Sequence, residues 1–189
     1  MSSEPSRLQI FFTVLLGYGV ARPYKRYVDS FGLTGNEVVL DYGSGSGRIS
    51  RHIAERLLPG KGHLTCVDVS KVWMETLQKR LKKYPNVDYK LGDITALDIA
   101  DNSYDIVVVH FVLHHVEIDQ QQEKLEILAR KLKPHGTLFI REPTRAEHGA
   151  PTAEIRALMS AAGLHERASR MTKSLMGEVF DGVFDKAPV

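Results

Sequence analysis

Hydrophobic and polar positions follow two different periods along the chain from residue 37 onward. Short apolar runs that suit buried strands are separated by segments in which apolar residues recur every three or four positions, as on one face of a helix. The predicted strands are residues 37–42, 63–69, 87–93, 104–113 and 137–142. The predicted helices are residues 48–58, 71–84, 120–132 and 152–164. This alternation indicates a parallel sheet covered by helices on both faces.

The C-terminal part of the chain has a different pattern. Residues 166–175 and 177–186 both have the pattern of strands, with only the Met-Gly pair at 176–177 to turn between them. Strands joined so closely must run antiparallel. We therefore expect an α/β fold with a Rossmann-like, doubly wound, mostly parallel sheet that ends in an antiparallel hairpin.

The N-terminal segment is strongly apolar over residues 8–21. This stretch is too short to span a bilayer, which takes about 20 residues. It is similar to the hydrophobic region of a secretory signal, but Glu4 weakens the positive charge that should precede such a region. We expect residues 1–34 to form a helical cap docked on a domain of residues 35–189. A helix that meets a membrane surface or gates the substrate, and a signal peptide, are the alternatives.

Composition and charge narrow the class of protein further. The chain has 189 residues, which suits one domain with a full-sized core. Its formal net charge of +2 does not predict nucleic-acid binding, so no DNA partner is expected. Cys66 is the only cysteine, so a disulfide or a cysteine-based zinc site within the chain is excluded, and no metal is predicted. We expect a cytoplasmic protein that is a monomer or a homodimer.

A glycine-rich turn follows the first predicted strand. Gly43, Gly45 and Gly47 stand at alternate positions after Asp41. Glycine permits positive φ and a close ligand, and the helix that follows offers N–H groups and a positive dipole end. The spacing is neither the G-x-G-x-x-G of dinucleotide sites nor a P-loop. Asp41 would repel a pyrophosphate but attract an ammonium group, so a ligand with an amino-acid end fits both parts of the turn.

Two further acids mark the ends of the next two predicted strands. Asp68 ends the second strand, where a carboxylate can accept hydrogen bonds from both hydroxyls of a ribose. Asp93 ends the third strand, where it can meet an adenine amino group. A ligand that combines an amino-acid end, a ribose and an adenine is S-adenosylmethionine.

Five segments in order give the chain its resemblance to a known family. The segments "VLDYGSGSGRIS", "VDVS", "GDITALD", "YDIVVVHFVLHHV" and "LKPHGTLFI" resemble the motifs of class I S-adenosylmethionine-dependent methyltransferases, over about residues 35 to 186. The resemblance implies the seven-stranded methyltransferase fold, with S-adenosylmethionine as cofactor and S-adenosylhomocysteine as product. It implies a cofactor site formed by Asp41, Gly43, Ser44, Gly45, Gly47, Asp68, Val69, Asp93, Ile94 and His110.

The segment "FVLHHV" bears on the acceptor. It is similar to small-molecule and quinone-biosynthesis methyltransferases, and it lacks the [DNS]-P-P-[YFW] motif of enzymes that methylate exocyclic amines of bases. The expected reaction is therefore in-line transfer of a methyl group to an O, N, S or C atom of a small molecule. His114 and His115 are expected to orient the acceptor or act as base. Glu142 either faces the acceptor or pairs with a neighbouring arginine.

Other interpretations remain open at this point. Tyr18 or Tyr27 could line the substrate pocket, and residues 8–21 could contact a membrane surface or a lipid-like substrate. The acceptor could be RNA or protein, or the chain could be a non-catalytic S-adenosylmethionine-binding partner. A nicotinamide-dependent oxidoreductase is disfavoured because the dinucleotide fingerprint is missing.

Overall fold

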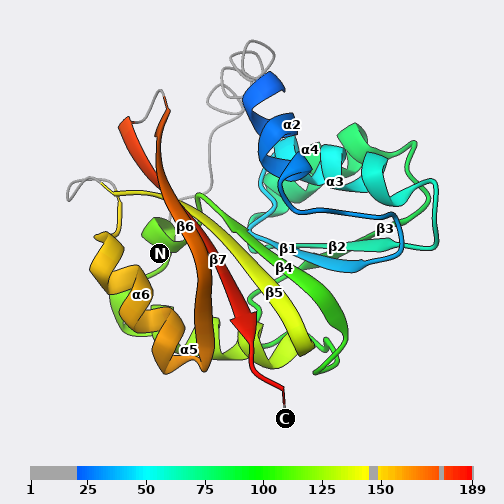
Figure 1. The fold of residues 1–189 in the computed structure, drawn as a ribbon. Coiled ribbons are helices and arrows are strands. Elements are labelled where there is room, and N and C mark those ends of the chain that lie inside the picture. Colours follow the sequence, from blue (N-terminus) through cyan, green and yellow to red (C-terminus); the bar gives the residue numbers. More distant parts are fainter. Residues whose placement is uncertain (1–20, 145–148, 175–176, 189) are drawn as a thin grey trace. The chain divides into compact units, whose positions relative to one another are not determined.

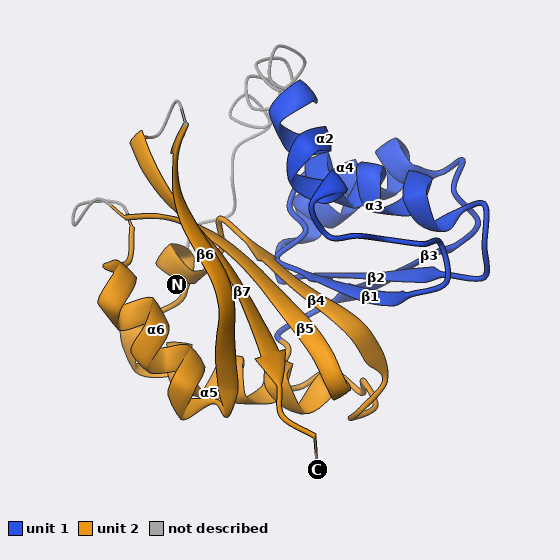
Figure 2. Cartoon of the chain, viewed as in Figure 1, with its two compact units in different colours: residues 1–93 blue, residues 94–189 orange. Residues whose placement is uncertain are grey.

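The computed structural model describes residues 21–144, 149–174 and 177–188 (Figure 1). These residues form two compact units, one ending at Asp93 and the other beginning at Ile94 (Figure 2). Tyr18 and nearly all of the apolar segment 8–21 lie outside the described residues. The predictions made for that segment therefore stay predictions.

The first unit contains three parallel strands in the order β3-β2-β1. The strands are β1 (Val38–Tyr42), β2 (His63–Asp68) and β3 (Val87–Leu91). The helices are α2 (Ala21–Asp29), α3 (Arg48–Leu57) and α4 (Lys71–Leu81). Figure 2 shows these helices together on one side of the three strands.

The two longer helices of this unit bury the faces that the sequence pattern predicts. Ile49, Ile53 and Leu57 of α3 are 0–3% exposed, and Leu77 of α4 is fully buried. Each such side chain stabilises the fold by about 1.5–3 kcal/mol relative to an exposed position. Helix α4 begins where predicted, because Ser70 Oγ accepts a hydrogen bond from the Trp73 amide N–H at 3.3 Å and so caps the helix.

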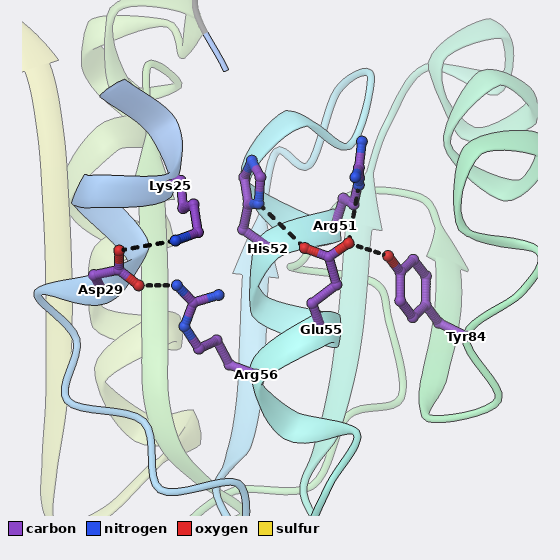
Figure 3. A network of polar contacts seen from close by, with 7 residues as sticks. All are labelled: Lys25, Asp29, Arg51, His52, Glu55, Arg56 and Tyr84. Atoms are coloured by element: carbon purple, nitrogen blue, oxygen red, sulfur yellow. Dashed lines mark hydrogen bonds and ion pairs between the residues drawn. The ribbon is translucent and has the colours of Figure 1, made fainter. Parts of the chain in front are cut away.

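Charged side chains connect α2 to α3 at the surface of the first unit (Figure 3). Asp29 of α2 forms an ion pair with Arg56 of α3, and its Oδ2 lies 4.0 Å from Nζ of Lys25. Glu55, the residue before Arg56 in α3, accepts a hydrogen bond from the Tyr84 hydroxyl at 2.6 Å. Pairs of this kind contribute about 0–1 kcal/mol each, since the groups stay partly solvated.

Burial of aromatic and apolar side chains gives α2 a stronger attachment to the unit. Tyr27 is 3% exposed and Val28 is 1% exposed. The rings of Tyr27 and Phe31 meet edge to face, with centroids 4.9 Å apart. The sequence suggested Tyr18 or Tyr27 for a substrate pocket; Tyr27 is packed in the core of the first unit, and its contact with a substrate stays a prediction.

The second unit contains four strands in the order β4-β5-β7-β6. The strands are β4 (Tyr104–His110), β5 (Leu132–Pro143), β6 (Leu164–Ser174) and β7 (Gly177–Lys186). The helices are the 3-10 turn η2 (Leu113–His115), α5 (Ile118–Lys131) and α6 (Thr152–Ala161). Strand β4 is parallel to β5, while β7 runs antiparallel to both β5 and β6. The predicted C-terminal hairpin is therefore confirmed.

Four predicted boundaries in this unit are wrong, and for the first two the structure shows a local reason. Strand β4 ends at His110 because Phe111 adopts a positive φ of 58° and turns the chain out of the sheet. Strand β5 begins at Leu132, which pairs with Tyr104, and residues 133–136 form an irregularity before the regular pairing resumes. Helix α6 ends at Ala161, and β6 follows almost at once at Leu164.

Hydropathy along the helices gives one further result. Within the described ranges, no helix is both long enough and apolar enough to cross a bilayer.

Candidate cofactor and acceptor sites

The glycine turn after β1 is anchored to the neighbouring strand. The backbone N–H groups of Gly43 and Ser44 both donate to the carbonyl oxygen of Val67 in β2, at 2.8 and 3.0 Å. The Ser44 hydroxyl donates to the carbonyl oxygen of Asp41 at 2.7 Å. These bonds hold the turn in a fixed conformation before any ligand binds. Such preorganisation lowers the entropy cost of binding.

Gly45 and Gly47 serve different purposes in this turn, although both have positive φ, 52° and 73°. A Cβ built on Gly45 would meet only the Gly43 carbonyl oxygen, at 3.9 Å, so the protein leaves the space beside Gly45 open. A Cβ on Gly47 would lie 2.4 Å from Leu77 Cδ1. Gly45 therefore suits a closely approaching ligand, whereas Gly47 lets α3 pack against α4.

Asp68 is tied directly to the turn. Its Oδ2 accepts a hydrogen bond from the Gly45 amide at 2.8 Å, and its Oδ1 accepts one from the Ser70 amide at 2.8 Å. A carboxylate oxygen can accept more than one hydrogen bond, which is the property that a site for ribose hydroxyls needs. The neighbouring Val69 is 59% exposed. The structure thus places Asp68, which is predicted to bind the ribose, in direct contact with the predicted glycine turn.

Asp41 lies deeper than the sequence suggested. Its side chain is 1% exposed within β1, and its Oδ2 accepts a hydrogen bond from the Ser50 hydroxyl at 2.5 Å. Burial raises the pKa of Asp41 to about 7, and the nearby charge of Asp68 also raises it, while the bond from Ser50 works in the opposite direction. Ser50 is a partner that the sequence did not reveal. In the sequence, the only sign of this contact is that Ser50 lies on the inward face of α3.

The first unit has features that fit an amino-acid end of a ligand. Helix α3 begins at its N-cap residue Gly47 with no side-chain hydrogen bond to cap it. Such a helix end carries unsatisfied N–H groups and partial positive charge, which suit a carboxylate. When ionised, Asp41 would supply the opposite charge for an ammonium group, and the space at Gly45 would allow a close approach. The group that these residues fit is the methionine part of S-adenosylmethionine.

In the second unit, Glu142 has partners that the sequence did not suggest. Its side chain is 0% exposed, near the end of β5, and a contact with the acceptor stays a prediction. Its Oε1 accepts hydrogen bonds from the backbone N–H groups of Val112 and Leu113, at 2.6 and 2.7 Å. Its Oε2 lies 2.6 Å from Nδ1 of His114. The carboxylate therefore connects β5 to the turn that follows β4.

The two predicted histidines differ in their surroundings. The His114 side chain is 9% exposed and is held by Glu142. His115 is exposed, and its ring centroid lies 4.0 Å from that of His114. Partial burial, and then the charge of His114, lower the pKa of His115 below its usual value. His114 is therefore the oriented member of the pair.

The remaining predicted cofactor residues divide between the two units. Asp93 is the last residue of the first unit and follows β3 by two positions. Ile94 begins the second unit and is 2% exposed, and His110 is the last residue of β4. Contacts of these three residues with adenine or with the sulfonium group stay predictions.

The seven strands of the described residues and the glycine turn after β1 define an α/β protein of the class I methyltransferase type. A family model described as a methyltransferase domain matches residues 39–136. The chain belongs to this family and is an S-adenosylmethionine-dependent methyltransferase domain. The predicted fold class and cofactor are thereby confirmed.

Curated relatives give a similar result at the level of sequence. The chain is 31% identical over 133 residues to the ubiquinone/menaquinone biosynthesis C-methyltransferase UbiE of Hydrogenovibrio crunogenus, over 68% of this chain and 51% of that protein. It is 30% identical over 132 residues to UbiE of Haemophilus ducreyi, over 68% and 50%. The chain spans about half the length of the curated relatives it matches.

Solved structures share the fold at lower sequence identity. A SAM-dependent methyltransferase from Aquifex aeolicus matches with a TM-score of 0.72 and 21% identity, over 86% of this chain and 88% of that chain. A putative methyltransferase in complex with the Haloferax volcanii Trm112 methyltransferase activator matches with a TM-score of 0.78 and 16% identity, over 98% and 100%.

Proposed function

We propose that this protein transfers a methyl group from S-adenosylmethionine to a small-molecule acceptor. The observation that carries the proposal is the anchored turn at Gly45, which is open to a ligand and held by the Asp68 carboxylate. Asp41 would hold the ammonium group, the N-terminus of α3 the carboxylate, and Asp68 the ribose. Bound in this way, the donor presents its methyl group for in-line displacement by the acceptor.

The acceptor that we propose is a phenolic ring of the kind that occurs in quinone biosynthesis. Support comes from the UbiE proteins, which are C-methyltransferases of ubiquinone and menaquinone biosynthesis. A phenolic hydroxyl has a pKa of about 10, so an enzyme that methylates such a ring benefits from a base that removes its proton. His114 and His115 are the candidate bases of the second unit.

Isothermal titration with S-adenosylmethionine tests the donor site. We expect Asp68→Ala to weaken binding by about tenfold or more, because it removes a charged acceptor both from the ligand and from the Gly45 amide. The matched control is Asp88→Ala, a strand β3 aspartate whose side chain is 66% exposed. Equal affinities for the wild type and Asp68→Ala, or no binding by the wild type, would overturn the proposed donor site.

Transfer of a radiolabelled methyl group tests the acceptor. We expect labelled product with a hydroquinone that lacks a ring methyl group and none with bulk RNA or protein. Label in RNA or protein would replace the small-molecule acceptor with a macromolecule. Donor binding with no transfer to any of these acceptors would favour the alternative of a non-catalytic S-adenosylmethionine-binding partner.

Assembly and surface contacts form the less specific part of the proposal. We propose a monomer or homodimer, with residues 8–21 meeting a lipid-like acceptor or a membrane surface. A second candidate is a methyltransferase that works with a separate activator chain, as suggested by the full-length match to the methyltransferase in the Haloferax volcanii complex. Light scattering of the purified chain, and its sedimentation with anionic vesicles, separate these arrangements.

A further inference from the structure

The Glu142 carboxylate is surrounded by more hydrogen-bonding groups than a single ion pair would provide. Two backbone N–H groups and one imidazole nitrogen surround its carboxylate at 2.6–2.7 Å, and none of the side chain reaches solvent. A buried carboxylate is costly unless every oxygen is bonded. This arrangement satisfies both oxygens and fixes the side chain, so Glu142 cannot itself reach an acceptor.

The contact with His114 determines where the imidazole carries its proton. A glutamate carboxylate accepts hydrogen bonds, so Nδ1 of His114 must donate to Oε2 across the 2.6 Å contact. In the neutral ring the other nitrogen, Nε2, is then an acceptor with a free lone pair. The carboxylate therefore selects one tautomer of His114 and fixes the orientation of its ring.

Other groups besides Glu142 also hold the turn that carries His114. Gln121 of α5 is 5% exposed, and its Nε2 donates to the carbonyl oxygens of Leu113 and Val116, at 3.1 and 3.2 Å. The Phe111 amide donates to the Arg141 carbonyl oxygen at 2.8 Å, which ties the start of the turn to β5. Glu142 and Gln121 together hold the backbone of the turn, and Glu142 also holds the His114 ring, as a precisely placed base requires.

We infer that Glu142 is a positioning residue that holds His114 with Nε2 ready to take the proton of the methyl acceptor. The inference rests on the proposed function. Nε2 takes the hydroxyl proton of a phenolic acceptor, and the electron pair left behind makes the oxygen or a conjugated ring carbon nucleophilic. That atom bonds to the methyl carbon while the S–C bond breaks and leaves its electron pair on sulfur.

The proton balance closes for either attacked atom. After attack by oxygen, the imidazolium of His114 releases the acceptor's proton to water. After attack by a ring carbon, that carbon loses its hydrogen as a proton to water, and His114 returns the first proton to the oxygen. In both cases one proton is released for each methyl group transferred. The Glu142 carboxylate stabilises the imidazolium that forms in between.

The isosteric variant Glu142→Gln tests this inference. Its amide oxygen can still accept from the two backbone N–H groups, but its NH₂ group must donate to Nδ1 of His114, which moves the imidazole proton to Nε2. We expect ¹⁵N NMR of the histidine side chains to show His114 protonated at Nδ1 in the wild type and at Nε2 in the variant. The matched control is Glu126→Gln, an exposed glutamate of α5, which should leave the His114 signals unchanged.

Kinetics provide the second measurement. With a hydroquinone acceptor, we expect Glu142→Gln to lower kcat by about 100-fold or more while the KM for the acceptor and the Kd for S-adenosylmethionine change little. His114→Ala should cost a similar factor, and the double variant little more. If the wild type does not bind S-adenosylmethionine, the proposed function is overturned, but the role of Glu142 in fixing the His114 tautomer is not. An unchanged His114 tautomer in Glu142→Gln, or wild-type kcat with the tautomer reversed, would overturn the role of Glu142.

Discussion

At the scale of one residue, the binding role proposed for Asp41 conflicts with the stability of the ligand-free fold. Its carboxyl is 1% exposed and has a pKa of about 7 in the fold, compared with about 3.9 in an unfolded chain. Because the folded pKa is raised, the stability linked to this group is fully present below about pH 3.9 and is lost as the pH rises through 7. A bound ammonium group would offset that loss, because it favours the ionised carboxylate.

We expect Asp41→Asn to stabilise the ligand-free protein at neutral pH. The variant removes a buried charge, and its side-chain oxygen can still accept the hydrogen bond from Ser50. The difference in Tm between variant and wild type should grow from pH 4 to pH 7 and then level off, with about 2–4 °C for each kcal/mol. Thermal unfolding followed by circular dichroism measures it. A difference that is constant across this range, or one reproduced by the exposed Asp98→Asn, would contradict the assignment.

At the residue scale, the sequence predicts where the candidate side chains lie along the strands and turns, but it does not predict their hydrogen-bond partners. Asp68 lies beside the glycine turn, as its position after an apolar strand suggested. Glu142 turned inward because its donors come from the turn after β4, about 30 positions earlier, and no local pattern shows that pairing. Ser50 and Gln121 were missed for the same reason.

At the scale of elements, the junction of β1 and α3 depends on a glycine that has a packing role. Gly47 has a φ of 73°, and a Cβ there would lie 2.4 Å from Leu77 of α4. Gly32 has a similar φ of 68° and nothing within 4 Å. The two positions share the backbone strain of a side chain in the left-handed region and differ only in the space available.

We therefore expect Gly47→Ala to destabilise the protein by about 3 kcal/mol and Gly32→Ala by about 1 kcal/mol. The shared part is the cost of a left-handed alanine, and the excess at Gly47 is overpacking against α4. Urea unfolding at equilibrium measures both values. Equal losses of stability would show that Leu77 moves aside without cost and that Gly47 is needed for its backbone conformation alone.

The sequence predicted the order and type of the elements well because hydrophobic periodicity determines both. It failed where backbone conformation departs from that periodicity. The apolar run of β4 continues past His110 in the sequence, but the positive φ of Phe111 ends the strand. The Lys-Pro-His-Gly segment at 133–136 has the composition of a helix stop, yet it lies within the bounds of β5 as an irregularity. Neither feature has a signature in apolar spacing.

In the molecule as a whole, the first unit contains the glycine turn that is proposed to bind the methyl donor. The second unit contains His114, whose ring is oriented by Glu142. The curated relatives are about twice as long as the segment they share with this chain. The family and the fold follow from the motifs between residues 39 and 136. The acceptor depends on surfaces that motif spacing does not describe, which is why the sequence predicts the methyl donor more specifically than the acceptor.

The single cysteine, Cys66, can be used to measure how often the first unit opens. Cys66 is 0% exposed in the middle strand of the first unit, between Asp41 of β1 and Tyr89 of β3. Burial raises the pKa of its thiol, so it is inert while the strands stay paired. The rate of labelling by a thiol reagent therefore measures how often this unit opens, with no engineered probe. We expect S-adenosylmethionine at about 100 times its Kd to slow labelling by about 100-fold, and an unchanged rate would show that the donor binds elsewhere.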